Sequence, residues 1–485
     1  MDYLTLITQQ KQDKLALIED EEEYTYARLA QAACELRSQA DFSAPAVFIY
    51  ESSIARQLIS FLAYSGTKTV PVIATEVSKN QQFCCDDIPQ AACMGVMTSG
   101  STGKSKLLWR SYHSWADFFS EQNRVFGVDE QTVIFCQGSL AFTGNLNIYM
   151  GVLAAGGTLA VTQRFRPRHW LQLMQRYAVN AIYLIPSKLL LLPKFLREPD
   201  LRVRSIISGS QSMGRQEADK LLQIFPNADI TLYYGASELN YITYIKAEEM
   251  TDDRTLIGRP FKGVRVSVCN EEIFIDTPYH VEKISLPFSL KDMGHLDAEG
   301  RLHFLGRTDD IVSVNGRKVS AVKVCTALTE LEGIEEAAVI CRHVDDVDVL
   351  IAFVGAAREY GKQELVKLLR QTLEDYELSK QFVFMEQLPH NESGKVDKLA
   401  LKKLSLKFFK KTSCQNAKRM VIYITVRHTD IGPVVQLVRM PPCHGGGRGF
   451  ESHPGRQCGN SSVVEHLLAK EGVASSNLVF RSIGA

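Results

Sequence analysis

Between residues 45 and 245, short apolar runs alternate with segments in which apolar residues recur every three or four positions. The short runs are typical of buried strands, and the periodic segments are typical of amphipathic helices. Predicted strands are 46–50, 69–74, 132–136, 181–186, 205–208 and 230–235, and predicted helices include 169–178 and 214–225. Alternation of this kind predicts a largely parallel sheet covered by helices.

The pattern changes after Gly306. A predicted helix near 319–331 is followed by the strands EEAAVICR and VLIAFVG, a helix at 362–376 and the strand QFVFMEQ. This order predicts a small, separate α+β unit. We therefore expect an α/β fold with a large N-terminal domain of layered sheets and helices (1–306) and a small, mobile α+β C-terminal domain (307–410).

Residues 411–485 fit neither domain, because the run beginning GPVVQLVRMPPCHGGG has no helix or strand period and no persistent apolar face. The text resembles the conceptual translation of tRNA genes. The T-arm sequence GTTCGAATC reads Phe-Glu-Ser in one frame, as at 450–452, and Ser-Asn in another, as within 475–478. The other interpretation is a disordered or lightly folded tail, and in both the tail carries no activity.

Composition and charge exclude several function classes. The 485 residues contain 55 Lys and Arg and 55 Asp and Glu, so the net charge does not favour nucleic acid or an anionic membrane as a partner. The first residues lack the features of a signal peptide, and the most apolar run, 181–195, contains Pro186 and Lys188 and is too short to span a bilayer. The eleven cysteines include no CxxC pair. We expect a cytoplasmic protein with free thiols.

The segment MTSGSTGKSK (97–106) has the composition of a phosphate-binding loop. Glycines let the backbone approach phosphate groups, hydroxyls donate hydrogen bonds, and lysines offset negative charge. A Walker A loop is disfavoured, because its pattern needs glycine where Thr98 stands and a helix afterwards, whereas LLWRSYHSW begins like a strand. Taken alone, a flexible surface turn explains the segment equally well.

The segment is similar to the phosphate loop of the adenylate-forming superfamily, which includes acyl-CoA synthetases, luciferases and adenylation domains and has the pattern T-S-G-[ST]-T-G-x-P-K. Ser105 replaces the proline of this pattern. The matching residues are Thr98, Ser99, Gly100, Ser101, Thr102, Gly103 and Lys106. The resemblance implies that they bind the phosphates of ATP and that Thr102 takes part in catalysis.

A second segment, YYGASE (233–238), resembles the family's Y-G-x-T-E. The resemblance implies that Tyr234 stacks on adenine, next to Gly235. Ser237 keeps the hydroxyl of the usual threonine, and Glu238 is implied to act in catalysis by holding Mg²⁺ at the phosphates. The alternative is an ordinary strand end followed by a glycine turn and a helix cap.

A third segment, KDMGHLDAEGRLHFLGRTDDIVSVNGRKV (291–319), resembles the family's T-G-D…D-x-x-G…G-R-x-D-D series. The implied roles are ribose binding for Asp292, ribose and phosphate binding for Arg307, and an interdomain hinge at Asp309. Leu290 and Lys291 replace the usual Thr-Gly pair. An ordinary hairpin explains the DAEG turn alone.

The fourth segment, LPHNESGKVDK (388–398), resembles L-P-x-T-x-x-G-K at the end of the family's small domain. Lys395 is implied to contact the carboxylate and the α-phosphate during adenylation. The four motifs therefore span 97–398 in family order. The resemblance implies ATP-dependent activation of a small carboxylic acid, fatty or aryl, to an acyl-adenylate, followed by thioester formation with release of AMP and pyrophosphate.

The implied cofactors are ATP, Mg²⁺ and either coenzyme A or the phosphopantetheine of a carrier protein. We favour an acyl-CoA ligase. A stand-alone adenylation protein that loads an acyl or peptidyl carrier protein is the alternative. A non-catalytic nucleotide-binding homologue is the third interpretation, motivated by Ser105 and Lys291 but disfavoured by Lys395, Glu238 and Asp292. The segment GSLAFTGNLN (138–147) lies where the family places its acyl pocket.

Overall fold

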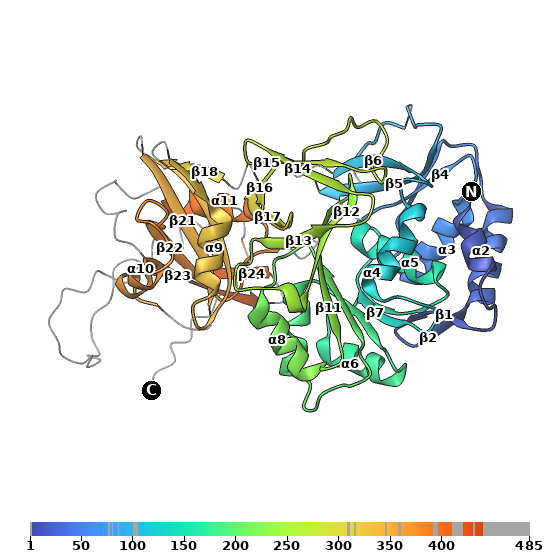
Figure 1. The fold of residues 1–485 in the computed structure, drawn as a ribbon, viewed down its shortest axis with the longest axis horizontal. Helices are drawn as coiled ribbons and strands as arrows, with labels where there is room; N and C mark the ends of the chain where they lie inside the picture. Colours follow the sequence, from blue (N-terminus) through green and yellow to red (C-terminus); the bar gives the residue numbers. More distant parts are fainter. Residues whose placement is uncertain are drawn as a thin grey trace, which may run out of the picture. The chain divides into compact units, whose positions relative to one another are not determined.

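The computed structural model describes residues 2–75, 78–79, 81–85, 87–99, 105–307, 311–314, 317–344, 347–356, 360–390, 396–409, 421–429 and 432–439 (Figure 1). Its α-helices are α1 (Tyr3–Thr8), α2 (Tyr26–Gln39), α3 (Ile54–Tyr64), α4 (Phe119–Phe126), α5 (Thr143–Ala154), α6 (Pro167–Arg176), α7 (Pro186–Leu189), α8 (Arg215–Ile224), α9 (Ala321–Thr329), α10 (Lys362–Leu369) and α11 (Lys398–Phe409).

The strands up to Arg307 are β1 (Leu15–Glu19), β2 (Glu22–Thr25), β3 (Ala46–Ile49), β4 (Val70–Ile73), β5 (Ala92–Ser99), β6 (Ser105–Ser111), β7 (Val133–Gln137), β8 (Thr158–Thr162), β9 (Ala181–Tyr183), β10 (Ser205–Gly209), β11 (Asp229–Ala236), β12 (Asn240–Lys246), β13 (Leu256–Pro260), β14 (Arg265–Cys269), β15 (Glu272–Asp276), β16 (Asp292–Leu296) and β17 (Leu302–Arg307). Those that follow are β18 (Ile311–Val314), β19 (Arg317–Ser320), β20 (Ile334–Val344), β21 (Val347–Ala356), β22 (Gln381–Met385), β23 (Val421–Thr429) and β24 (Gly432–Arg439).

The largest sheet has 13 strands in the order β14-β15-β16-β17-β13-β12-β11-β10-β9-β7-β8-β1-β2. The adjacent strands β11, β10, β9, β7, β8 and β1 run parallel, which confirms the predicted parallel sheet. Beyond β11 each neighbour pairs antiparallel, an extension that the alternation of strands and helices did not indicate. Because parallel strands end at a common edge, the loops that follow β7, β8, β10 and β11 share one side of the sheet.

The predicted strands 46–50 and 69–74 are present as β3 and β4, but they belong to a separate sheet. That sheet has the order β3-β4-β5-β6, and its last pair is antiparallel. The predicted helices 169–178 and 214–225 are confirmed as α6 and α8. Helix α6 starts at Pro167, whose fixed φ angle suits the first helical position, and buries Trp170 against the parallel sheet.

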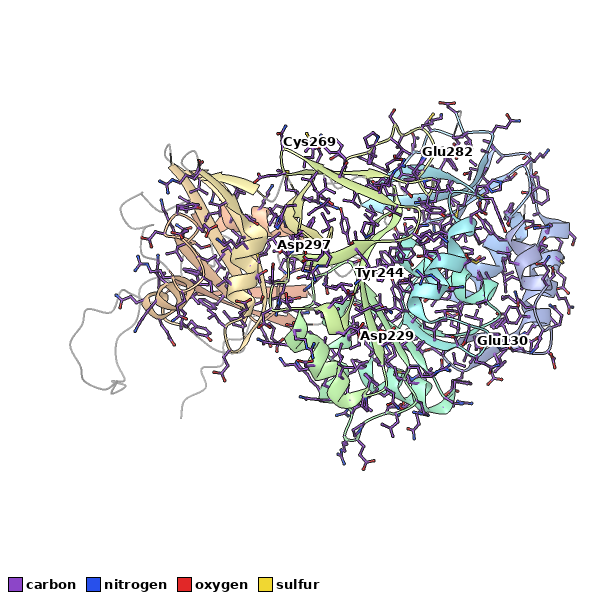
Figure 2. The ribbon with its side chains drawn as sticks, in the orientation of Figure 1. Glu130, Asp229, Tyr244, Cys269, Glu282 and Asp297 are labelled. Carbon is purple, nitrogen blue, oxygen red and sulfur yellow. The ribbon has the colours of Figure 1, made fainter. Side chains whose placement is uncertain are left out.

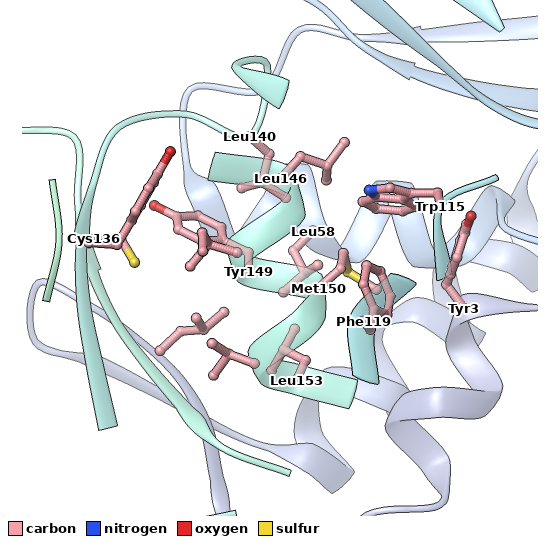
Figure 3. Packing of buried hydrophobic residues seen from close by; sticks show 14 of the residues in the cluster. Tyr3, Leu58, Trp115, Phe119, Cys136, Leu140, Leu146, Tyr149, Met150 and Leu153 are labelled. Atoms are coloured by element: carbon pink, nitrogen blue, oxygen red, sulfur yellow. The ribbon is translucent and has the colours of Figure 1, made fainter. Parts of the chain in front are cut away.

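Helix α5 lies inside the main hydrophobic core (Figure 3). Tyr149, Met150 and Leu153 pack with residues such as Leu58 and Cys136, so the helix is apolar nearly all around, as interior helices are. Of its two buried amides, Asn145 and Asn147, the second accepts a hydrogen bond from the indole of Trp115 and donates to the Asn240 side chain at 2.8 Å. This packing fixes the helix that follows residues 138–142.

The C-terminal part contains the predicted small α+β unit. Helix α9 and strands β20, β21 and β22 follow in the expected order, and β20 pairs antiparallel with β21 while β22 is parallel to it. The predicted helix 362–376 is wrong beyond Leu369. The Glu377 carboxylate, held at 2.6 Å by the Lys323 amine, accepts the Glu374 N–H at 3.0 Å, so that this N–H is not donated to a helical carbonyl.

The expectation that no element follows residue 410 is wrong for residues 421–439. Strand β23 pairs parallel with β22, and β24 pairs antiparallel with β23. The run VIYITVRH, rich in β-branched residues, accounts for this extension of the small domain's sheet. The tRNA-like text from 440 onward lies outside the described residues, and the proposed origin of the tail and the domain boundaries stay predictions.

Among the helices of the described residues, none is long and apolar enough to cross a membrane.

Candidate active site

The predicted phosphate loop connects two antiparallel strands. Thr98 lies opposite Lys106, and Ser99 lies opposite Ser105, so 100–104 join β5 to β6. The strand that was predicted to follow the loop is therefore confirmed, whereas a Walker A loop leads into a helix. Gly100, Ser101, Thr102 and Gly103 lie outside the described residues, and their roles stay predictions.

Tyr234 and Asp292, which the sequence places 58 residues apart, meet side by side. The Tyr234 hydroxyl, near the end of β11, donates a hydrogen bond to a carboxylate oxygen of Asp292. Burial, followed by the charge of Asp292, raises the pKa of Tyr234 well above its usual value, so the phenol stays protonated and remains a donor. Its ring also packs against Phe304, with centroids 5.7 Å apart. The predicted adenine stack stays a prediction.

Arg307 completes this cluster. Asp292 begins β16 and Arg307 ends β17, and the antiparallel register places them opposite each other. The Arg307 Nε lies 3.3 Å from an Asp292 carboxylate oxygen, yet the arginine side chain is 61% exposed while Asp292 is 1% exposed. The site thus combines a buried anion with a cation that extends to solvent. Sequence reasoning selected all three residues, and the structure brings them together.

Lys291, which stands where the family pattern has glycine, adopts a glycine-like backbone conformation. Its φ angle is +62°, in the left-handed region that glycine adopts without strain. The Lys291 amine pairs with Glu272 at 2.8 Å, and its N–H donates to the Ser289 hydroxyl at 3.0 Å. These two contacts hold the conformation that a glycine would adopt freely, so Asp292 keeps its place at the start of the strand.

Gly235 follows Tyr234 at an irregularity in the pairing of β11 with β12. A Cβ atom here would lie 2.6 Å from the Asn240 carbonyl oxygen, so glycine is required by close backbone approach. The Ser237 hydroxyl donates to the Thr143 hydroxyl at 2.9 Å, which joins this motif to the start of α5. The Glu238 carbonyl accepts the Val281 N–H at 2.8 Å, so the half-buried Glu238 has a fixed backbone position.

Sequence reasoning missed Arg110, which lies four residues after Lys106 on β6. Its side chain is completely buried, and its guanidinium donates to the carbonyls of Ser237, at 2.8 Å, Ser114, at 3.1 Å, and Tyr279, at 3.3 Å. Burial lowers its pKa to about 10, which still leaves it charged at neutral pH. An arginine flanked by apolar strand residues, in LLWRS, was the available signal.

Two further backbone contacts strengthen this junction. The Glu282 N–H donates to the Trp109 carbonyl at 2.7 Å, and the neighbouring Val281 N–H reaches Glu238, as described above. Glu282 is labelled in Figure 2, in the segment that follows β15. The strand after the phosphate loop is therefore tied to the segment that carries Tyr234 and Glu238 in two ways, through the Arg110 side chain and through the backbone of residues 281–282.

The predicted acyl-pocket segment, 138–147, follows β7 and continues into the first turns of α5. The Gln57 amide oxygen accepts hydrogen bonds from the Ser139 hydroxyl and the Leu140 N–H, both at 3.0 Å. At Gly144 a Cβ atom would lie 2.5 Å from the Tyr183 hydroxyl, so the first turn of α5 sits closely against that tyrosine. The segment is rigidly held beside Ser237, but its role in binding an acid stays a prediction.

Asp309 and Lys395 lie outside the described residues. The described residues on either side of Lys395 pair with each other. His390 and Val396 form a β-bridge, and the Asp397 N–H donates to the Pro389 carbonyl at 2.7 Å. The Asp309 hinge and the catalytic role of Lys395 stay predictions.

Two family models match the chain. A model described as AMP-binding enzyme matches residues 73–276, and one described as AMP-binding enzyme C-terminal domain matches residues 324–395. Together they cover more than half of the chain. The chain belongs to the adenylate-forming superfamily. This membership confirms the resemblance that the four motifs indicated.

The superfamily member described here is 27% identical over 323 residues to an uncharacterized acyl-CoA ligase of Bacillus subtilis, a match that covers 63% of this chain and 67% of that protein. It is also 27% identical over 342 residues to a D-alanine–D-alanyl carrier protein ligase of Lactococcus lactis, covering 63% and 68%. A delta-poly-L-ornithine synthetase of Acinetobacter baumannii is 26% identical over 348 residues, but only 26% of its length is covered.

Solved structures show the same fold. The o-succinylbenzoate coenzyme A synthetase from Bacillus subtilis in complex with AMP superposes with a TM-score of 0.72 at 18% identity, covering 83% of this chain and 98% of that one. ATP-bound MatB from Rhodopseudomonas palustris gives a TM-score of 0.73 at 18% identity, covering 84% and 99%. The predicted α/β fold with a smaller C-terminal domain is confirmed.

Proposed function

We propose that this protein is an acid–thiol ligase that activates a fatty or aryl carboxylic acid with ATP and transfers the acyl group to coenzyme A. The cluster of Tyr234, Asp292 and Arg307 carries this proposal. A carboxylate has two acceptor oxygens and is suited to bind both hydroxyls of a ribose. The exposed guanidinium beside it is suited to a phosphate oxygen. Such a pair supports a nucleotide site where β16 begins and β17 ends.

The first half-reaction joins two anions. A carboxylate oxygen of the substrate attacks the α-phosphorus of ATP, the bond to the β-phosphate breaks, and pyrophosphate leaves with that electron pair. Little covalent help from the protein is needed; position and positive charge matter. Lys106 and Lys395 would supply that charge, and the Thr102 hydroxyl would donate to the phosphates. In the second half-reaction a thiol attacks the acyl carbonyl, loses its proton, and releases AMP.

Glu238 is the residue proposed to hold Mg²⁺. The described residues contain no group of three or more His, Cys, Asp and Glu side chains that could hold a metal ion. This arrangement fits Mg²⁺, which usually binds one or two carboxylates, the phosphates of a substrate and several waters. When bound there, the ion would offset the charge of the phosphates.

Loading of a carrier protein is the second candidate function. The similarity to a D-alanine–D-alanyl carrier protein ligase is as high as the similarity to the acyl-CoA ligase, and favours neither acceptor. The acceptor is distinguished by adding coenzyme A or a carrier protein with its phosphopantetheine to ATP and the acid and by following AMP release.

A panel of fatty and aryl acids, screened by pyrophosphate release, tests the proposed function. We expect release that depends on one class of acid and on Mg²⁺, and that is lost in Asp292→Asn. The matched control is Asp297→Asn, because Asp297 lies on the turn that follows the same strand, outside the cluster. Nucleotide binding without pyrophosphate release for any acid would favour the non-catalytic homologue.

A further inference from the structure

The net charge of the chain is zero, but one long segment contains no acidic residues. Residues 131–197 contain no Asp or Glu, whereas the whole chain has 55. The same segment contains seven Lys and Arg residues and one histidine. The seven are Arg164, Arg166, Arg168, Arg176, Lys188, Lys194 and Arg197. Arg164, Arg176 and Lys194 pair with acids from elsewhere in the chain, so an excess of positive charge that attracts anions is expected only around the others.

Three of these arginines surround one surface depression of about 540 Å³, which we name the arginine face. It is lined by Arg164, Phe165, Arg166, Pro167, Arg168, His169, Gln172 and Phe195. The Arg168 guanidinium lies 5.8 Å from the centroid of the Phe195 ring. Phe165 is 60% exposed and Phe195 is 39% exposed. Arginines beside exposed aromatic rings are suited to a ligand that carries phosphates and a flat ring.

One nearby carboxylate, that of Asp20, holds two residues of this face in place but does not pair with its other arginines. Asp20 lies 2.9 Å from the His169 Nε2 and 3.6 Å from the Arg164 Nε. Among the described residues, neither Arg166 nor Arg168 has a carboxylate within 4.0 Å, and both side chains are exposed. The backbone is also held, because the Trp170 indole donates to the Arg164 carbonyl at 2.8 Å. Two guanidinium groups therefore remain available on a supported loop.

The arginine face lies on the same edge of the large sheet as the nucleotide motif. Its loop follows β8, and Tyr234 and Glu238 lie at the end of β11 and directly after it. The strands β8, β7, β9, β10 and β11 are adjacent and parallel, so the two loops are four strand spacings apart, or about 19 Å. A ligand bound to the arginine face would need a long, flexible arm to reach the acyl-adenylate.

We propose that the arginine face binds the phosphate-bearing adenine nucleotide end of coenzyme A, an inference that rests on the proposed function. In coenzyme A the long pantetheine arm separates the thiol from the phosphates, which matches the separation of the two loops. Arg166 and Arg168 bind the phosphates, since guanidinium groups form paired hydrogen bonds with phosphate oxygens. The exposed phenyl rings contact the adenine. The face thus contributes to acceptor binding and leaves adenylation unaffected.

The test compares acceptors that share a thiol but differ in the nucleotide. In the full chain, Arg166→Gln/Arg168→Gln is expected to raise KM for coenzyme A by about tenfold or more. KM for pantetheine, which lacks the nucleotide, and acid-dependent pyrophosphate release stay unchanged. The matched control, Arg176→Gln/Arg215→Gln, removes two exposed arginines elsewhere, on α6 and α8, and is expected to behave as wild type.

Direct binding by calorimetry gives a readout besides activity. Coenzyme A binds wild type with an affinity that falls as potassium chloride is raised, and the double variant loses most of that affinity. Three results would each overturn the inference. The double variant could keep the wild-type KM for coenzyme A, its KM for pantetheine could rise as much as its KM for coenzyme A, or the wild-type protein could transfer the acyl group to a carrier protein and not to coenzyme A. Absence of pyrophosphate release in wild type would instead reject the proposed function itself.

Discussion

Arg110 and the arginine face use the same side chain in opposite ways. Arg110 is fully buried, and its guanidinium donates to three backbone carbonyls of the protein. Arg166 and Arg168 are exposed and have no carboxylate within ion-pair distance in the part of the chain that the structure describes. A buried guanidinium holds backbone segments in place, whereas an exposed one attracts anions and is screened by salt. Burial therefore decides whether an arginine acts on the protein or on a ligand.

The largest effect is expected from a third kind of cation, Lys395, which the family resemblance places on a turn of the small domain. Lys395→Ala is expected to lower the rate of adenylate formation by about two orders of magnitude or more, because one positioned charge is lost where negative charge develops. Transfer from a supplied acyl-adenylate to the thiol is expected to persist. Separate rate measurements of the two half-reactions check this.

The complementary variant is Asp309→Pro at the predicted hinge. Proline restricts φ, so this change is expected to spare adenylation and to block thiol transfer, if transfer uses a second position of the small domain as the predicted hinge implies. Equal loss of both steps in Lys395→Ala would show that the lysine is structural. Lys395 would then not be a catalytic cation, and only Arg110 and the arginine face would remain in the comparison.

Arg110→Met tests the buried member of the comparison. It leaves up to three carbonyls without a charged donor, so we expect the free energy of unfolding to fall by about 3 kcal/mol. Because the Ser237 carbonyl is one of them, the KM for ATP should rise in Arg110→Met. In Arg110→Lys, which keeps a charged donor, the loss of stability and the rise in KM should both be smaller. Urea unfolding and ATP kinetics measure the two effects.

Arg166→Met is the control for Arg110, since its side chain is exposed. Its stability and its KM for ATP should equal those of wild type. If Arg110→Met lowered stability without changing KM for ATP, Arg110 would be a packing residue and not a positioning residue for the nucleotide motif.

Glu238→Gln tests an anionic residue of the proposed site, in contrast to the cations above. A carboxylate supplies charge to Mg²⁺ that an amide cannot, so we expect about a tenfold weaker use of Mg-ATP at limiting Mg²⁺. The loss should shrink as Mg²⁺ is raised. Forward and reverse adenylation assays at several Mg²⁺ concentrations measure it, and wild-type kinetics at limiting Mg²⁺ would contradict the assignment.

The smallest effect is expected at Asp20, the carboxylate that supports the arginine face. Burial raises its pKa, but hydrogen bonds from Thr162 and His169 and the charge of Arg164 outweigh this and lower it. A carboxyl whose pKa is lower in the folded state adds stability above its unfolded pKa of about 3.9, and this stability is lost as the pH falls through the folded value.

Asp20→Asn should therefore lower the free energy of unfolding by about 1 kcal/mol or less at pH 6, because the pair is partly exposed. The difference from wild type should shrink as the pH falls below the unfolded pKa and through the folded pKa of Asp20. Urea unfolding of both proteins across this range measures the effect. A difference that persists in acid would show that Asp20 contributes by packing.

The residues of the nucleotide cluster, Tyr234, Asp292 and Arg307, could be selected from the sequence because they lie in motifs that resemble those of the adenylate-forming superfamily. Antiparallel pairing brings the last two together. Arg110 could not be predicted, since its role depends on carbonyls from Ser237 and Tyr279, which are remote in the chain. Total charge also concealed the arginine face, because acids elsewhere balance it.

Periodicity predicted the parallel strands and helices α6 and α8 well. It failed for the predicted helix 362–376, because α10 ends at Leu369 and, farther along, Glu377 accepts the Glu374 N–H that a continued helix would donate to a backbone carbonyl. It also failed beyond residue 410, where composition concealed two paired strands. Local pattern thus gives the elements, whereas their ends depend on contacts between distant residues.

The hydrogen bond between Tyr234 and Asp292 would make the proposed binding of a ribose to Asp292 an exchange of hydrogen bonds. The carboxylate already accepts a hydrogen bond from the phenol hydroxyl and faces the Arg307 guanidinium. A ribose that approaches it has to compete with these partners, so the net gain is the difference between two sets of hydrogen bonds. We therefore expect a 2′-deoxy nucleotide to bind more weakly. Its sugar has one hydroxyl fewer and so forms fewer hydrogen bonds with Asp292 in place of those that it displaces.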